Sequence, residues 1–251
     1  MITAAELKKY SSLLRKKLRE EENQFLIEGE KLLYEALSAG TEIIIVMKQL
    51  STDISPGLLS LLAKKKIPFE DLRSDQFRKL TDTVNSQGIV AVVNSAGIKK
   101  KDLKKIDTPL VLLLNNISDP GNMGTILRTA LWFGVKDIIL SGDCVEIFNP
   151  KVVRSAMGAL FKLNFYEQHP EEIAIMKEMG YRICVSDMNG KDVNELKKHG
   201  KTVLVMNNES RGPDPVILCV ADDIVSIPGK GDAESLNVAV SAAVLLFVLT
   251  N

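Results

Sequence analysis

The chain has 251 residues, of which 45% are hydrophobic and 25% are charged, and its 32 basic side chains balance 32 acidic ones. A chain of this size and composition excludes global disorder and can form one large domain or two small ones. Its three cysteines, Cys144, Cys184 and Cys219, are far apart and lack CxxC or Cys/His spacing, so the sequence predicts neither a disulfide framework nor a metal site and favours a cytoplasmic location.

The first predicted elements alternate between helix and strand. Residues 4–19 predict a helix, and a short extended segment at residues 25–27 precedes a second helix, which Gly40 ends. Further strands are predicted at residues 42–47, 67–72 and 88–93, and further helices after Pro56 and at residues 74–80.

A lysine-rich stretch separates this region from the rest of the chain, and its composition predicts a linker. We therefore predict a first domain at residues 1–97, a linker at residues 98–109 and a second domain at residues 110–251. Residues 1–105 carry 19 basic and 14 acidic side chains. This excess of basic side chains either binds the phosphates of a polyanion or forms solvated helix faces, and charge alone leaves both possibilities open.

The second region repeats the alternation more regularly. Residues 111–114 form a continuous apolar run, as expected of a strand that is buried on both faces. A loop separates this strand from a predicted helix at residues 123–133. Strands that alternate with helices predict an α/β fold whose largely parallel sheet is covered on both sides. The further predicted strands lie at residues 137–140, 181–186, 202–206 and 224–227.

The chain ends on an apolar segment, residues 238–249. A bilayer-spanning helix needs roughly 20 residues, so this shorter segment predicts a buried helix and no membrane contact. The N-terminal residues carry charges where a signal peptide would be apolar, which argues against a secretory signal.

Polar residues follow three predicted strands of the second domain. Ligands of open α/β sheets bind at the carboxyl ends of the strands, so the three loops form the candidate site. In the first loop, Asn122 suits the cap of the next helix, and Gly121 and Gly124 allow a ligand to approach the backbone. Arg128 lies on an otherwise apolar helix, where it either serves a site or forms a surface ion pair.

The other two loops carry a carboxylate and several small polar residues. Glu209 follows the strand at residues 202–206 and either belongs to a site or caps a local turn. We predict that Ser235 is the N-cap of the last helix. Asn237 is a poor helix former unless its side chain has a role near the helix terminus.

In their order, these loops resemble the three motifs of the SpoU (TrmH-type) branch of the SPOUT methyltransferases. Three ordered motifs are more specific than any single one, and together they cover roughly residues 111–249. The N-terminal region resembles, more loosely, a small α/β RNA-recognition domain that many members carry. The matching positions are Asn116, Asp119–Asn122, Gly124, Arg128, Ala130 and Gly134 in the first motif, Asn208, Glu209 and Gly212 in the second, and Ile227, Pro228 and Ser235–Asn237 in the third.

The resemblance implies transfer of a methyl group from S-adenosylmethionine to a ribose 2′-hydroxyl of structured RNA, with ribosomal RNA favoured over transfer RNA. It also implies a parallel α/β catalytic domain with a deep C-terminal trefoil knot, preceded by the RNA-recognition domain. General topology rules argue against knots, so this expectation rests on the resemblance alone. Members work as homodimers, and we expect the last helix, with Leu245 and Val248, to face the partner.

The resemblance also assigns roles to single residues. Arg128 is the residue implicated in activating the hydroxyl. A guanidinium has a pKa of about 12 or above and accepts protons poorly, so we expect Arg128 to clamp the target phosphate and to stabilise the developing alkoxide. The other expected catalytic residues are Asn122, Glu209, Ser235 and Asn237, and the cofactor is expected to lie against Asn207, Ile227 and Leu236.

The chain departs from the family pattern at two positions. Asn207 stands where the family usually has glycine, and Pro213 stands where an aliphatic residue is commoner. Asparagine tolerates a positive φ better than most residues do, so the loop can form. One alternative is a catalytically inactive SpoU-fold protein that binds RNA or assists ribosome assembly, and another is a nucleotide-binding α/β enzyme of different chemistry.

Overall fold

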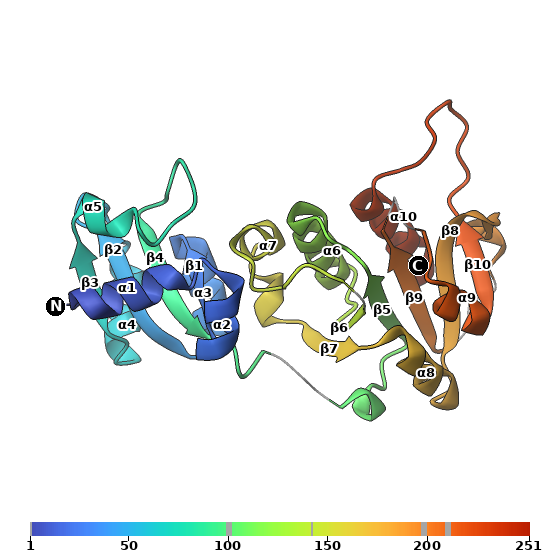
Figure 1. Cartoon of the computed structure of the whole chain (residues 1–251), viewed down its shortest axis with the longest axis horizontal. Coiled ribbons are helices and arrows are strands. Elements are labelled where there is room, and N and C mark those ends of the chain that lie inside the picture. Colours follow the sequence, from blue (N-terminus) through green and yellow to red (C-terminus); the bar gives the residue numbers. More distant parts are fainter. Residues whose placement is uncertain (1, 99–101, 142, 197–199, 209–211) are drawn as a thin grey trace. The chain divides into compact units, whose positions relative to one another are not determined.

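The computed structural model describes residues 2–98, 102–141, 143–196, 200–208 and 212–251 (Figure 1). The chain forms two compact units. The first contains the residues up to Ile98 together with Glu146–Phe161, and the second contains the rest. The predicted boundaries placed residues 146–161 in the second domain, whereas in the structure they pack with the first unit.

The first unit is a four-stranded mixed sheet with strand order β1-β4-β2-β3. Strand β4 pairs antiparallel with β1 and β2, and β3 pairs parallel with β2. The strands are β1 (Gln24–Glu28), β2 (Ile43–Gln49), β3 (Phe69–Leu72) and β4 (Ile89–Asn94), and the helices are α1 (Ala4–Ser12), α2 (Lys16–Glu22), α3 (Glu30–Ser38), α4 (Pro56–Lys64), α5 (Ser74–Phe77), α7 (Pro150–Ala156) and the 3-10 turn η2 (Ala159–Phe161).

The first predicted helix, residues 4–19, is two helices in the structure. Leu13 is completely buried, and the chain turns there before Arg15 adopts an extended backbone and starts α2. The prediction of one helix was therefore wrong. The apolar period continues through the turn because Leu13 packs into the core, and periodicity alone does not reveal such a break.

The second unit is a six-stranded sheet with strand order β10-β8-β9-β5-β6-β7, and all its strand pairs are parallel. The predicted parallel α/β sheet is confirmed. The strands are β5 (Leu110–Asn115), β6 (Asp137–Ser141), β7 (Asn164–Gln168), β8 (Arg182–Asp192), β9 (Thr202–Asn207) and β10 (Asp223–Ser226), and the helices are α6 (Pro120–Trp132), α8 (Ala174–Glu178), α9 (Pro215–Val220), α10 (Val238–Thr250) and the 3-10 turns η1 (Leu103–Lys105), η3 (Pro170–Ile173) and η4 (Val193–Glu195).

Strand β5 lies inside this sheet and is buried on both faces. Side chains of a strand alternate between the two faces. Val111 and Leu113 belong to a core cluster with residues of η3, α8 and α9. Leu112 and Leu114 are also completely buried and line the other face, where α6 and α10 pack against each other. This double burial explains the continuous apolar run at residues 111–114.

Helix α10 is apolar on every side, but only part of it is buried within its own unit. Leu245 and Leu246 are completely buried, whereas Val240 is 49% exposed and Phe247 is 57% exposed. The expectation that Leu245 faces a partner was wrong, because this side chain fills the core of its own subunit. No helix in the described ranges has the length and apolar character needed to cross a membrane.

A buried ion pair joins residues 146–161 to the first unit. Arg19 Nε lies 3.1 Å from Glu146 Oε1, and Arg19 Nη1 donates to the carbonyl of Leu13 at 2.8 Å. The two side chains are only 3% and 7% exposed. Beside them, the ring of Phe25 stacks on Phe148, with a centroid distance of 4.6 Å. An ion pair and an aromatic stack therefore hold this distant segment in the first unit.

We predict that Glu146→Ala lowers the free energy of unfolding by about 3–5 kcal/mol, because it leaves the buried Arg19 guanidinium without its counter-ion. The change is measured by urea unfolding of the full chain, monitored by far-ultraviolet circular dichroism. Glu22→Ala is the matched control, since Glu22 pairs with Lys9 in the same unit at side-chain exposures of 35% and 44%. That exposed pair is expected to contribute about 1 kcal/mol or less. Equal losses in the two variants would contradict the prediction.

Candidate active site

The first candidate loop turns sharply between β5 and α6. Asn116 adopts a left-handed backbone with φ of 59°, a conformation that asparagine tolerates well. Asp119 is the N-cap of α6, and its Oδ1 accepts a hydrogen bond from the backbone N–H of Asn122 at 2.8 Å. Asn122, whose type also suits a helix cap, is therefore not the N-cap of α6. Because Asp119 takes that role, the side chain of Asn122 is available for another contact.

That contact is a direct hydrogen bond between the first and third loops. Asn237 Nδ2 donates to Asn122 Oδ1 at 3.0 Å. The other end of the Asn237 amide caps α10, because its Oδ1 accepts from the N–H of Ala239 at 3.0 Å. Asn237, and not the predicted Ser235, is thus the N-cap. Ser235 is exposed in the preceding loop.

The second loop is tied to the first by a neighbouring asparagine. Asn208 Nδ2 lies 3.0 Å from the carbonyl oxygen of Asn116 and 3.3 Å from Ser118 Oγ. Residues 208, 122 and 237 therefore bring all three predicted loops together at the carboxyl edge of the sheet. The predicted catalytic residue Glu209 lies outside the described residues.

A row of buried polar side chains ends three adjacent strands. Asn115, Asn207 and Ser141 are in register at the carboxyl ends of β5, β9 and β6. Asn115 Nδ2 donates to Asn207 Oδ1 at 3.3 Å, and Asn207 Nδ2 donates to the carbonyl of Ser186 at 3.3 Å. Asn115 Oδ1 and Ser141 Oγ are buried, and neither has a hydrogen-bond partner in the described part of the chain.

Sequence reasoning missed Asn115 and Ser141. The available signal was a polar residue at the last position of an apolar strand. The structure also changes the explanation for Asn207, because this residue is the last of β9 and is not among the residues with positive φ. Its buried amide, bonded to β5 and β8, fills space where a glycine would have no side chain.

Arg128 lies on α6 and is exposed. Across the described ranges it forms no hydrogen bond or ion pair. The structure therefore leaves its five N–H donors available to a ligand.

A cavity of about 570 Å³ opens beside the third loop. Three of the predicted residues line it, namely Ile227, Ser235 and Leu236. Ser186 also lines it, and the carbonyl of Ser186 accepts the hydrogen bond from Asn207 Nδ2. Its size is typical of sites for small organic ligands, which range over about 300–1,000 Å³. Leu236 is 45% exposed, so an apolar surface faces this cavity without protein packed over it. The remaining lining residues are Asp187, Met188, Ser226, Pro228–Gly231, Ala233, Glu234 and Ser241.

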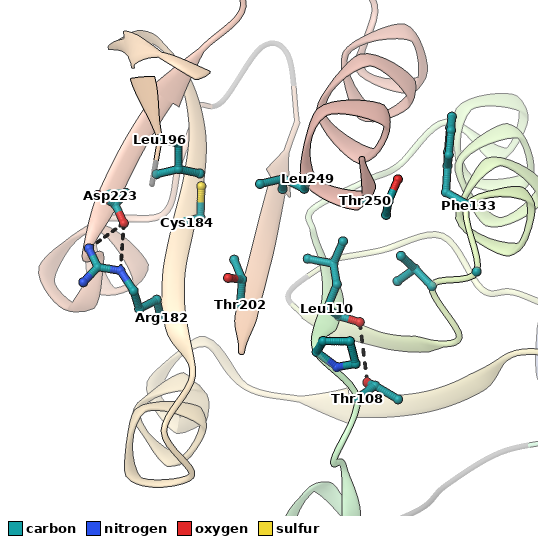
Figure 2. A pocket seen from close by; sticks show the side chains of 13 residues that line it. Thr108, Leu110, Phe133, Arg182, Cys184, Leu196, Thr202, Asp223, Leu249 and Thr250 are labelled. Atoms are coloured by element: carbon teal, nitrogen blue, oxygen red, sulfur yellow. Dashed lines mark hydrogen bonds and ion pairs between the residues drawn. The ribbon is translucent and has the colours of Figure 1, made fainter. Parts of the chain in front are cut away.

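A second cavity, of about 350 Å³, lies at the amino ends of β5, β8 and β9 (Figure 2). Its charged groups are already paired, because Arg182 Nη2 lies 2.6 Å from Asp223 Oδ2. None of the predicted site residues lines it. Since ligands of parallel sheets bind at the carboxyl ends of strands, the first cavity is the better candidate.

Cys144, three residues after the end of β6, is unsuited to nucleophilic catalysis. The Cys144 thiol donates to the carbonyl of Leu114 at 3.2 Å, and burial raises its pKa to about 11. A thiol with this pKa is a poor nucleophile at neutral pH. In the described ranges, no group of three or more His, Cys, Asp or Glu side chains could hold a metal ion.

Two family models match the chain. The model described as the SpoU rRNA Methylase family covers residues 109–247, which include all three loops. The model described as the MRM3-like substrate binding domain covers residues 4–91.

Curated relatives match over different lengths. The chain is 33% identical to the 23S rRNA (guanosine(2553)-2′-O)-methyltransferase RlmP of Bacillus subtilis over 97% of this chain and 95% of that protein. It is 34% identical to the human mitochondrial rRNA methyltransferase 3, but that match covers 58% of this chain and 35% of the human protein.

Solved structures match over nearly the full chain. One is an rRNA methyltransferase from Sinorhizobium meliloti with AdoMet bound, at 26% identity and a TM-score of 0.88, covering 99% of this chain and 95% of the other. Another is the SpoU methyltransferase AviRb from Streptomyces viridochromogenes in complex with AdoMet, at 25% identity and a TM-score of 0.86, covering 99% and 97%.

Proposed function

We propose that this chain, which belongs to the SpoU rRNA methylase family, transfers a methyl group from S-adenosylmethionine to a ribose 2′-hydroxyl of ribosomal RNA. The family model over residues 109–247 confirms the resemblance seen in the sequence motifs. The observation that carries the activity is the meeting of the three loops at the carboxyl edge of the sheet, next to a cavity that the third loop lines.

The cavity residues fit S-adenosylmethionine. Ile227 and Leu236 offer apolar side chains to an adenine face, and the backbone groups around them can bind its polar edge. Asp187 and Glu234 add carboxylates that suit the ribose hydroxyls and the positive charge of the cofactor. The bound cofactor supplies a methyl group that is already activated by its sulfonium.

The chain must then position the ribose oxygen and assist the loss of its proton. Arg128 is exposed and has no partner among the described residues, so its planar guanidinium can bind a phosphate with two parallel hydrogen bonds. From there it stabilises negative charge that develops on the attacking oxygen. The Asn122–Asn237 hydrogen bond fixes the loop in front of α6 against the loop that lines the cavity. Glu209 and Ser235 complete the proposed set of catalytic residues.

We predict that Arg128→Lys lowers the turnover number by about a hundredfold, because a lysine lacks the forked donor geometry and removal of one transition-state donor has effects of this size. Methyl transfer from radiolabelled S-adenosylmethionine to in vitro transcribed 23S ribosomal RNA measures the effect. Calorimetry with the cofactor is the control and is expected to give a wild-type Kd. Near-normal turnover with unchanged RNA affinity would contradict the clamp.

The same assay, followed by mapping of ribose methylation, tests the activity itself. The alternative is an inactive SpoU-fold protein that binds RNA or assists ribosome assembly. The wild-type chain would then bind RNA but transfer no methyl group to 16S or 23S ribosomal RNA or to transfer RNA.

The first unit is proposed to recognise the RNA, in keeping with the description of the family model that matches residues 4–91. Its total charge contributes little, because residues 1–98 and 146–161 together carry 16 basic and 14 acidic side chains. The basic excess noted in residues 1–105 comes mainly from the lysines after residue 98. Recognition by this unit therefore depends on particular contacts more than on a general attraction for polyanions.

A homodimer through α10 is part of the proposal. Phe247 is 57% exposed and Val240 is 49% exposed on α10, and Trp132 at the end of the neighbouring α6 is 84% exposed. The ring of Phe133 lies 6.3 Å from that of Phe247 and joins the two helices. Large apolar side chains exposed on two helices that pack together favour association with a second copy.

Accordingly, we expect Phe247→Asp to give a monomer with little activity, because it places a charge in the apolar interface. Analytical ultracentrifugation gives the oligomeric state, and methyl transfer is measured on the same sample. Val216→Asp on α9 is the matched control, since Val216 is 41% exposed and lies on the other side of the sheet. A fully active Phe247→Asp monomer would refute the interface.

We also propose the deep trefoil knot that the family resemblance implies. In support, β9 lies between β8 and β5, and the chain returns from the edge strand β10 to α10, which packs on α6 and β9. Stretching the second unit from its ends in an optical trap is expected to leave a chain shortened by the tightened knot. Recovery of the full contour length would argue against threading.

A further inference from the structure

We propose that the loop between α5 and β4, residues 81–88, is a recognition loop that presents Val84 to an unpaired nucleotide of the RNA substrate (Figure 1). The inference rests on the proposed function, since it names the part of the first unit that contacts the RNA. It is independent of the catalytic loops, which all belong to the second unit.

The recognition loop is anchored by one carboxylate. Glu28, the last residue of β1, accepts hydrogen bonds from Thr81 Oγ1 at 2.7 Å and from Thr83 Oγ1 at 3.0 Å. It also accepts one from the backbone N–H of Gln87 at 3.0 Å. A single side chain thus holds both ends of the loop.

Further contacts hold the loop from its sides. Asp82 forms an ion pair with Arg154 of α7. At the far end, the carbonyl of Gly88 accepts from the N–H of Gln49 at 2.8 Å, and Gly88 has a φ of 75°. A side chain at position 88 would collide with Thr52. This packing explains the glycine and shows that the loop has a defined conformation.

Val84 lies at the tip of the anchored loop and is 99% exposed. Burial of a valine side chain stabilises a fold, and at this position the fold gains nothing from it. Leu50, which follows β2 at the same end of the sheet, is 59% exposed. The loop is anchored by several contacts and yet exposes an apolar side chain to solvent. Contact with a partner explains this exposure better than a role in folding does.

The neighbouring side chains favour RNA as that partner. Arg78 and Lys79 lie between α5 and the recognition loop, are exposed, and have no ion-pair partner in the described part of the chain. They can bind phosphates, while the amide of the exposed Asn85 can bind a base edge. Bases of an A-form duplex lie in a groove that side chains cannot enter, so Val84 is suited to an unstacked base in a loop or bulge.

The test is the affinity of the full chain for in vitro transcribed 23S ribosomal RNA, measured by filter binding without cofactor. We expect Val84→Ala to raise the Kd by about fivefold to tenfold, because two methyl groups lose their apolar contact with the base. Its melting temperature should stay at the wild-type value because the side chain is exposed. Leu59→Ala, at a residue of α4 that is 43% exposed, is the matched control and should bind as the wild type does.

The salt dependence separates the two kinds of contact. In the double variant Arg78→Ala/Lys79→Ala, the slope of log K against log salt should fall by roughly one to two, because phosphate contacts are lost. The Val84→Ala slope should not change. The proposal that residues 81–88 recognise RNA is overturned if Val84→Ala has the wild-type Kd. It is also overturned if the wild-type chain does not bind ribosomal RNA. Binding without methyl transfer would instead overturn only the proposed activity.

Discussion

The candidate site depends on one hydrogen bond, from Asn237 to Asn122, which joins segments 115 residues apart in the chain. Each of these asparagines has two functions. Asn237 caps α10 with its oxygen and binds the first loop with its nitrogen, while the backbone of Asn122 is held by Asp119. The start of α10 and the start of α6 are therefore fixed relative to each other. The cavity lined by Ser235 and Leu236 takes its place from the same contact, because these residues directly precede the cap.

Two buried polar side chains at this edge of the sheet are exceptions to the rule that polar groups inside proteins are hydrogen-bonded. Asn115 and Ser141 end apolar strands, and each keeps an oxygen without a partner among the described residues. Local rules of this kind fail most often where a protein binds a ligand, because the site is shaped for contacts that the free chain does not make. Two of the three buried side-chain oxygens without a partner in the described ranges therefore lie where the motifs meet, and the third, Gln24 Oε1, lies in β1 of the first unit.

Much of the sheet could be predicted from the sequence because its signals are local. The apolar run of β5 and the glycine that follows α6 depend on neighbouring residues only. Strand β7 was missed, since its sequence, NFYEQ, has few apolar residues and its pairing partner β6 is distant in the chain. The caps could not be assigned for a related reason. Asp119 and Asn122 are both good N-caps in isolation, and so are Ser235 and Asn237, and only tertiary contacts decide between them. Likewise, no local pattern places Glu146 beside Arg19.

The segment Glu146–Phe161 has a consequence for how such proteins can diversify. The chain leaves the second unit after β6, contributes this segment to the first unit, and returns to form β7. The first unit is thus not formed by one continuous stretch of the chain. Recombination at the lysine-rich linker would transfer residues 1–98 to a relative without residues 146–161. Phe25 and Arg19 would then face the corresponding segment of that relative, which was selected to pack against different residues. New RNA specificities in this architecture are more accessible through substitutions in exposed loops than through exchange of the whole domain.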